Sequence, residues 1–290
     1  RQQLVLDFSR EEVADYIFDS LCRVLDSANV EYLKWDMNRS VIDVYSALAG
    51  CAEQGEVLYK YTLGLYRFLD RIGRRYPNIL IEGCCGGGGR FDAGMLYYGP
   101  QIWCSDNTDA IDRIRIQYGT SFGYPISAVG SHVSAVPNHQ TGRSVPLKTR
   151  GAVAMAGSFG YELDLGKLTP AEKEEVKAQV KAYKDNWKLI QDGEYYRLSN
   201  PYEPDGLGAW EFAAEDGSEA LLTVVALNTH GNPLTSYVRL KGLRADGWYR
   251  DEAAGKMYEG RALMEGGIPV PHMEDEYQSW QMHLRLCEEH

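Results

Sequence analysis

The sequence predicts an α/β fold in which part of a (β/α)8 TIM barrel is followed by a C-terminal antiparallel β-sandwich domain. Over the first two-thirds of the 290 residues, short apolar strands alternate with amphipathic helices. Such alternation indicates a parallel sheet with helical crossovers. Polar and reactive residues fall where these strands end, as they do in barrels. After about Gly193 the pattern changes to short alternating strands separated by Gly, Pro, Asn and Asp turns.

The barrel part begins with a helix and a strand. Ser9 is placed to cap this helix, and Glu12, three residues on, completes a capping box. Residues 30–35 are predicted as a strand that ends at Asp36. The helix that follows has a continuous apolar inner face at helical spacing, formed by Leu58, Leu65, Phe68, Leu69 and Ile72.

Four further strands are predicted, at residues 78–84, 101–105, 128–136 and 159–165. The apolar run at 79–81 suggests a strand buried on both faces. Helices are expected at 111–118 and from Thr169-Pro170 onward, because proline suits the first turn of a helix. Five strands leave an eight-stranded barrel about three strands short, and we expect those three to have preceded Arg1.

The chain is therefore divided into residues 1–193, the C-terminal part of a barrel, and residues 194–290, the antiparallel β domain. Strands are expected in the second part at 220–226 and 236–240. Trp248 and Trp280 are the candidate core aromatics of this domain.

Composition and charge limit the partners. The net charge of -11 argues against nucleic acid and against an anionic membrane, because both repel a negative surface. No apolar run approaches the roughly 18 residues needed to cross a bilayer. The six cysteines have no regular spacing and form no C-x-x-C pair, which argues against a zinc site and favours reduced thiols in a cytoplasmic protein. A neutral substrate suits this composition.

Two aspartates stand at predicted strand ends and are the candidate catalytic residues. Asp36 is flanked by Lys34 and Arg39, either of which could keep it ionised for attack on an anomeric carbon. Asp106 follows another strand, and two carboxylates converging from different strands are what glycoside hydrolysis needs. The alternative is that such aspartates only cap the following helices. For Asp109, just before the helix at 111–118, we favour that alternative.

The glycine run at residues 83–90 resembles a phosphate-binding loop but fails the test, because Arg90 stands where the lysine of G-x-x-x-x-G-K-[ST] would be. Glycines after a barrel strand can let backbone approach a sugar ring closely, and a purely structural turn remains equally open. His132, His139 and Arg143 stay unassigned on the residues alone.

Four motifs together resemble those of bacterial α-galactosidases (melibiases) of glycoside hydrolase family 36, over nearly the whole chain. They are Lys-Trp-Asp-Met-Asn-Arg at 34–39, the glycine run at 84–92, Ser-Asp-Asn-Thr-Asp-Ala at 105–110, and the segment 132–143. Members of that family carry a large N-terminal β domain, a barrel and a C-terminal β domain. The resemblance implies that the strand ending at Asp36 is the barrel's fourth and the one ending at Asp106 its sixth, so this chain holds about strands 4 to 8.

The resemblance also implies roles for single residues. Asp36 matches the nucleophile and Asp106 the acid/base of a retaining mechanism. The matching sugar-binding positions are Lys34, Asn38, Cys84 and Gly87. No metal or organic cofactor is expected, and the parent enzyme is expected to be a homo-oligomer. Gly83 and Cys85 depart from the family's usual residues, which bears on fine specificity.

The predicted reaction is hydrolysis of terminal α-linked galactose from oligosaccharides such as melibiose or raffinose. Alternatives are a galactosyl transferase or an α-N-acetylgalactosaminidase of the same family type. A third is an inactive fragment that serves as a binding or assembly module. Because the first three strands of the barrel and their galactose-holding residues are not in this chain, we predict little or no activity from these 290 residues alone.

Overall fold

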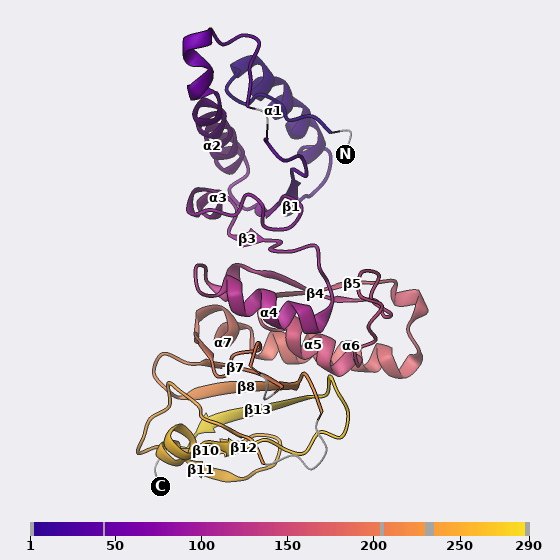
Figure 1. Cartoon of the computed structure of the whole chain (residues 1–290), viewed down its shortest axis with the longest axis vertical. Coiled ribbons are helices and arrows are strands. Elements are labelled where there is room, and N and C mark those ends of the chain that lie inside the picture. The colour runs from indigo at the N-terminus through magenta and orange to yellow at the C-terminus, as the bar shows by residue number, and fades with distance from the viewer. Residues whose placement is uncertain (1–2, 43, 204–205, 230–234, 288–290) are drawn as a thin grey trace. The chain divides into compact units, whose positions relative to one another are not determined.

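The computed structural model describes residues 3–42, 44–203, 206–229 and 235–287 (Figure 1). By the density of their contacts, the residues form two compact units, Arg1–Asp106 and Asn107–His290. None of the described helices is long and apolar enough to cross a membrane.

The first unit is a small parallel sheet with helices. Its sheet has the order β1-β2-β3, formed by β1 (Tyr32–Asp36), β2 (Leu80–Cys84) and β3 (Gln101–Ile102), and all neighbours run parallel. The helices are α1 (Glu11–Leu25), α2 (Val57–Arg75) and α3 (Ala93–Tyr98), with a short 3-10 turn, η1 (Cys51–Glu56), before α2. The alternation of strands and helices therefore produces the parallel pairing that the sequence predicts.

The core of this unit lies between one face of the sheet and the helices. Phe68 of α2 is almost fully buried and packs against Trp35 of β1 and Phe8, with ring centroids 5.3 and 5.1 Å away. Because side chains alternate along a strand, Trp35 faces the helices while Lys34 and Asp36 lie on the opposite face. This alternation places the candidate catalytic residue on the face of the sheet that the helices do not cover.

Three local predictions for this unit are wrong. Ser9 does not cap α1: its hydroxyl bonds to Asp7, and the N-cap is Arg10, which makes no side-chain cap. Leu58 is 46% exposed at the start of α2, and Leu80 is 38% exposed, so residues 79–81 are not buried on both faces. For Leu58 and Leu80 the local pattern was correct for the element, but the described residues do not bury these side chains.

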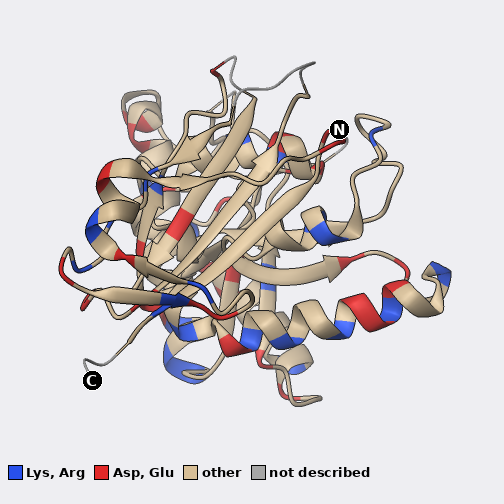
Figure 2. Ribbon diagram, turned by 90° about the horizontal axis from the view of Figure 1, so that it is seen from below, with Lys and Arg blue, Asp and Glu red and all other residues tan. Residues whose placement is uncertain are grey.

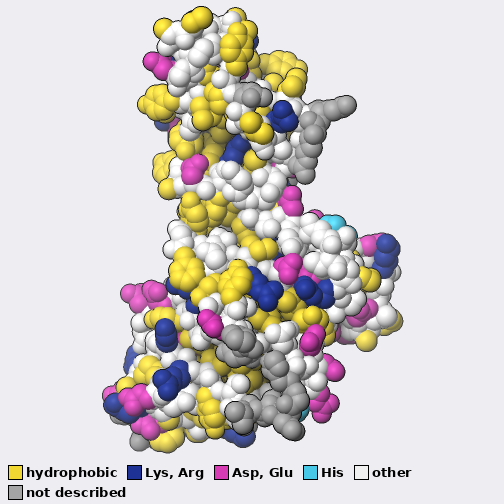
Figure 3. Space-filling model, in the orientation of Figure 1, with side chains coloured by type: hydrophobic (Ala, Val, Ile, Leu, Met, Phe, Trp, Pro, Cys, Tyr) yellow, Lys and Arg dark blue, Asp and Glu magenta, His cyan; other side chains and the backbone are white. Residues whose placement is uncertain are grey.

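Apolar side chains are prominent on the surface of the first unit. Figure 3 shows hydrophobic atoms gathered over the part of the view that Figure 1 labels α1 to α3. The exposed large apolar residues here include Leu4, Tyr16, Ile42, Tyr45 and Tyr97. Apolar surface on this scale is typical of a face that other protein covers.

The second unit begins with helices around a parallel strand pair. β4 (Gly130–Ser134) pairs in parallel with β5 (Ser158–Glu162). The helices are α4 (Ala110–Thr120), α5 (Leu147–Ala154), α6 (Pro170–Asp185) and α7 (Trp187–Asp192), with short turns η2 (Ile126–Ala128) and η3 (Leu165–Lys167). The predicted helix start at Thr169-Pro170 is confirmed, because Thr169 and Glu172 form a reciprocal capping box.

An antiparallel sheet domain completes this unit. Its six strands have the order β11-β10-β13-β8-β7-β6: β11 (Met257–Glu259), β10 (Trp248–Asp251), β13 (Ser279–Leu286), β8 (Glu219–Ala226), β7 (Leu207–Ala213) and β6 (Glu194–Arg197). A second pair, β9 (Tyr237–Val238) and β12 (Ile268–Pro269), shares its core, and η4 (Ala262–Gly266) precedes β12. In Figure 2 charged residues lie mainly on helices and loops, and these strands are largely uncharged.

The two tryptophans proposed for this core differ. Trp280 packs against it, but Trp248 is 54% exposed, so that prediction is wrong for Trp248. Trp248 is the first residue of β10, where its side chain falls on the outer face, whereas its neighbour Tyr249 is fully buried. Side chains alternate between the two faces of a strand, so a shift of one residue decides whether Trp248 or Tyr249 faces the core.

Candidate functional site

The candidate site lies at the C-terminal ends of β1, β2 and β3. The register pairs Lys34 with Glu82 and Asp36 with Cys84. Paired residues in parallel strands point to the same side, so these four side chains share the sheet face opposite the helices. The site is therefore built from two neighbouring strands before any loop is considered.

Asp36 is exposed at the end of β1 and is held by two neighbours. The side-chain amide of Asn38 donates to its Oδ2 at 2.5 Å. Burial raises the pKa of the Cys84 thiol to about 11, and a hydrogen bond to Asp36 adds to the rise. At neutral pH the thiol therefore stays protonated and supplies a hydrogen bond without adding a second negative charge.

The glycine run connects Asp36 to the third strand. The backbone N–H of Gly86 donates to the Asn38 side-chain oxygen at 2.7 Å. Gly87 has a φ of +83°, and a Cβ there would lie 2.7 Å from the Cα of Ser105 and 3.1 Å from the backbone nitrogen of Asp106. Only glycine allows so close an approach. The run thus has a structural role, which leaves contact with a sugar ring open.

Asp106 lies at this end of the sheet, next to the close approach between Gly87 and Ser105. It is exposed, it follows β3, and the pairing with β2 continues beyond β3 because the Trp103 N–H donates to the Gly83 carbonyl at 2.9 Å. The structure therefore brings Lys34, Asp36, Asn38 and Cys84 together directly. It places Asp106 against Gly87 at the same strand ends.

Sequence reasoning missed Glu82, which is fully buried on β2 beside Lys34. The Lys34 ammonium lies 3.3 Å from Glu82 Oε1 and 5.0 Å from the centroid of the Trp103 ring. The signal available in the sequence was an acidic residue inside an otherwise apolar strand. Such a residue is rarely buried without a partner.

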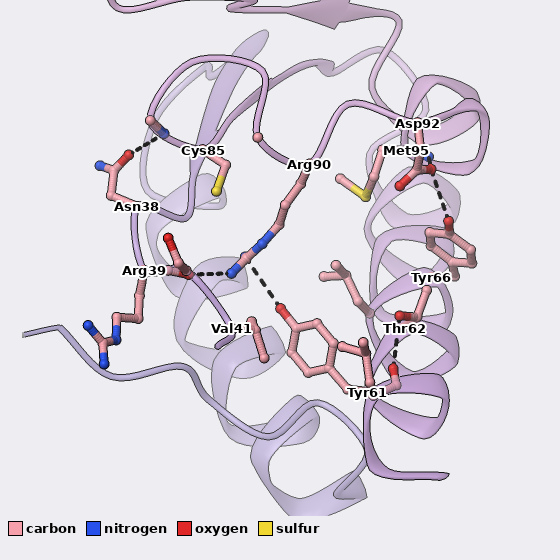
Figure 4. A pocket seen from close by; sticks show the side chains of 15 residues that line it. Asn38, Arg39, Val41, Tyr61, Thr62, Tyr66, Cys85, Arg90, Asp92 and Met95 are labelled. Atoms are coloured by element: carbon pink, nitrogen blue, oxygen red, sulfur yellow. Dashed lines mark hydrogen bonds between the residues drawn. The ribbon is translucent and has the colours of Figure 1, made fainter. Parts of the chain in front are cut away.

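A cavity of about 790 Å³ opens beside the site, lined by Asn38 and Cys85 and by residues of α2 (Figure 4). Arg90 points into it and donates to the Arg39 carbonyl at 2.7 Å, with the Tyr61 hydroxyl 3.5 Å away. Arg90, which ruled out the phosphate loop, therefore ties the glycine run to the loop after β1.

The residues of 132–143 lie in the second unit. His132 Nδ1 lies 3.3 Å from a Glu162 carboxylate oxygen, and His139 is exposed. Arg143 forms an ion pair with Asp109, which burial and two backbone N–H donors identify as the cap of α4. The capping interpretation of Asp109 is thus confirmed. Among the residues that the structure describes, no group of three or more His, Cys, Asp or Glu side chains could hold a metal ion.

Comparisons with known proteins match both parts of the chain. A family model described as Melibiase matches residues 1–193, and one described as Glycosyl hydrolase family 36 C-terminal domain matches residues 207–284. The bifunctional alpha-galactosidase/sucrose kinase AgaSK of Mediterraneibacter gnavus is 55% identical over 281 residues, which are 97% of this chain and 29% of that protein. Alpha-galactosidase AgaA of Geobacillus stearothermophilus is 51% identical over 289 residues, which are 100% of this chain and 39% of that protein.

Solved structures agree with these matches. The crystal structure of AgaA covers 98% of this chain, and 39% of the AgaA chain is covered, with a TM-score of 0.95 and 51% identity. A variant of that enzyme solved in complex with raffinose has a TM-score of 0.95 and 50% identity. This chain spans 29% to 39% of the lengths of the two curated relatives named here.

Proposed function

We propose that this chain, which belongs to the melibiase family of glycoside hydrolase family 36, carries the two catalytic carboxylates of a retaining α-galactosidase. The observation that carries the proposal is the environment of Asp36. Its exposed carboxylate stands at the end of a parallel strand and receives hydrogen bonds from Asn38 and from a protonated Cys84. These two contacts orient the carboxylate at the strand end, and an oriented carboxylate is the nucleophile that attack on an anomeric carbon needs.

In the proposed reaction Asp36 attacks the anomeric carbon of galactose. The bond from that carbon to the leaving oxygen breaks, and Asp106 gives its proton to that oxygen. Asp106 then takes a proton from water, the resulting hydroxide attacks the same carbon, and the ester bond to Asp36 breaks. Two inversions leave the galactose with its original configuration.

The remaining site residues are proposed to hold the sugar. Lys34 and Asn38 flank Asp36 at the exposed end of β1. Cys84 is the last residue of the neighbouring strand β2, and Gly87 lies in the loop that follows it. A neutral oligosaccharide agrees with the net charge of -11. The raffinose complex of the 50% identical relative supports the same substrate class.

We further propose that the five parallel strands are about strands 4 to 8 of a (β/α)8 barrel, with residues 1–193 as its C-terminal part and residues 194–290 as a β-sandwich domain. The parallel pairing within β1-β2-β3 and within β4-β5 supports this. So does the placement of Asp36 and Asp106 at strand C-termini.

A cytoplasmic homo-oligomer is proposed as the working form. All six cysteines are free thiols, which agrees with a reducing compartment. The apolar surface of the first unit agrees with burial against further protein. Sedimentation of the full-length protein that carries this chain would reveal a monomer if the assembly is wrong.

The test of the function is covalent labelling. In a fluorinated galactosyl fluoride the ring fluorine slows both steps and the fluoride leaving group speeds the first, so a sugar ester should remain on Asp36 that peptide mass spectrometry locates. The Asp36→Asn variant of the same full-length protein should be neither labelled nor active. Label on another residue would refute the assignment. Raising the concentration of an acceptor sugar in the same assay distinguishes hydrolysis from galactosyl transfer.

A further inference from the structure

Glu82 is a charged residue in the middle of a buried strand. It is 0% exposed, and the register pairs it with Lys34 on β1 and with Gln101 on β3. The three side chains therefore form a row across the sheet, on the face that carries Asp36. Burying a carboxylate is costly unless partners compensate for the lost water.

One oxygen of Glu82 is held by neutral donors. The Tyr32 hydroxyl donates to Oε2, and the Gln101 side-chain amide donates to the same oxygen at 2.5 Å. Burial and the bond to Glu82 raise the pKa of the Tyr32 hydroxyl well above its ordinary value, so this donor keeps its proton. These two contacts fix the orientation of the carboxylate and direct its other oxygen toward β1.

The other oxygen faces Lys34. The ammonium lies 3.3 Å from Oε1, and no donor among the described residues is aligned with Oε1 as a hydrogen bond. The ammonium also stands 5.0 Å from the Trp103 ring centroid, at cation–π distance. The lysine side chain remains 40% exposed, so it can still meet a ligand. A flexible side chain is thus held at two points while its tip stays accessible.

We propose that Glu82 is a positioning residue, which acts on the substrate only through Lys34. The carboxylate holds the lysine ammonium in place at the strand end, two residues before Asp36. A free lysine side chain samples many rotamers, and an anchored lysine has lost part of that freedom before the sugar arrives. The inference rests on the proposed function, because that function is what makes Lys34 a sugar-binding residue.

The test is a double-mutant cycle in the full-length protein that carries this chain. Glu82→Gln should lower kcat/KM for an α-galactoside by roughly 10- to 100-fold, mostly through KM, since displacing a substrate-holding group by about 1 Å has effects of this size. In the Lys34→Met background, Glu82→Gln should change kcat/KM less than about twofold, because its route of action is gone. Losses that multiply in the double variant, or no loss from Lys34→Met, overturn the proposal.

Two further variants keep the result decisive. Glu211→Gln also replaces a fully buried strand glutamate, but in the antiparallel domain, and should leave kcat/KM unchanged. If Glu82→Gln does not fold, Tyr32→Phe replaces it, because it removes one donor to Oε2 and leaves the charge. Its smaller loss should likewise vanish in the Lys34→Met background. Equal losses in both backgrounds would refute the positioning role.

Failure of the proposed function gives a different result. If Asp36→Asn retains the wild-type rate, the galactosidase assignment is wrong and the role of Glu82 falls with it. If Asp36→Asn is inactive and the cycle is multiplicative, the function stands and only the positioning role is lost.

Discussion

Glu211 makes the stability of the antiparallel domain depend on pH in a way that can be measured. It is fully buried in β7, on the core face between Ala209 and Ala213. The Lys241 backbone N–H donates to Oε1, whereas Oε2 has no partner within the described ranges. Burial raises the pKa of the Glu211 carboxyl from 4.5 to about 8.

The direction in which the free energy of unfolding changes with pH follows from proton binding. Between pH 4.5 and about 8 the folded chain holds a proton on Glu211 that the unfolded chain has released, so the free energy of unfolding falls as pH rises through this window. Below pH 4.5 both forms are protonated and nothing is lost. At roughly 1.4 kcal/mol per pH unit, the loss is about 3 kcal/mol at pH 7 and about 5 kcal/mol above pH 8.

Glu211→Gln removes the titrating group and keeps its size. The free energy of unfolding, obtained from urea titrations followed by circular dichroism, should equal that of wild type near pH 5, apart from a constant offset. The margin over wild type should be about 2.5 kcal/mol larger at pH 7 than at pH 5. Any unpaired amide in the variant adds a cost of about 1–3 kcal/mol at every pH, so the slope and not the offset is decisive.

The control is Glu215→Gln, which removes a glutamate that is exposed in the turn after β7. Its pH slope should match that of wild type. If Glu211→Gln shows the same pH slope as wild type, Glu211 is not the source of the pH dependence of stability.

Three further outcomes are expected. Gly87→Ala should cost roughly 2–3 kcal/mol of stability and most of the activity, because its Cβ would meet the Ser105 backbone at 2.7 Å. Gly86→Ala, with nothing within 4 Å of its Cβ, should cost only about 1 kcal/mol. Equal losses of stability in urea titrations would contradict the close approach at Gly87. At pH 8 iodoacetamide should modify the exposed Cys51 and leave Cys84 unmodified. The Cys84 pKa of about 11 leaves roughly one thiol in a thousand ionised at that pH. Mass spectrometry of early time points measures the two modifications. The 290 residues alone should release little or no galactose, and robust turnover by the purified chain would show that the proposed barrel is completed between copies.

Much of the fold follows from the sequence because local periodicity determines it. All five predicted parallel strands occur, although shorter than expected, and the start of α6 at Thr169-Pro170 is correct. Errors fall where burial depends on distant neighbours. Leu58 and Trp248 have the right spacing for their elements, but the residues that the structure describes leave about half of each side chain exposed. A periodic pattern identifies a face and not what covers it.

In the candidate site, too, some features could be predicted from the sequence and others could not. Asp36, Asp106 and their flanking residues could be named because their chemistry and strand-end positions are readable from the sequence. The partners of these residues could not be named. The β1–β2 register brings the Cys84 thiol beside Asp36, and the segment after β2 approaches the segment after β3 closely enough for Gly87 to meet Ser105.

The sequence by itself determined which elements form, which of their ends carry reactive side chains, and the family whose chemistry those side chains resemble. Only the tertiary structure decided what surrounds each charge. Tyr32 and Glu82 are 50 residues apart in the chain, and Glu211 lies between β6 and β8 and accepts from the Lys241 backbone, 30 residues further on. The energy of a carboxylate depends on its partners and on the water it loses, and both are set by packing between distant segments. For that reason the motif is enough to propose Asp36 as the nucleophile, whereas the environments of Glu82 and Glu211 required the fold.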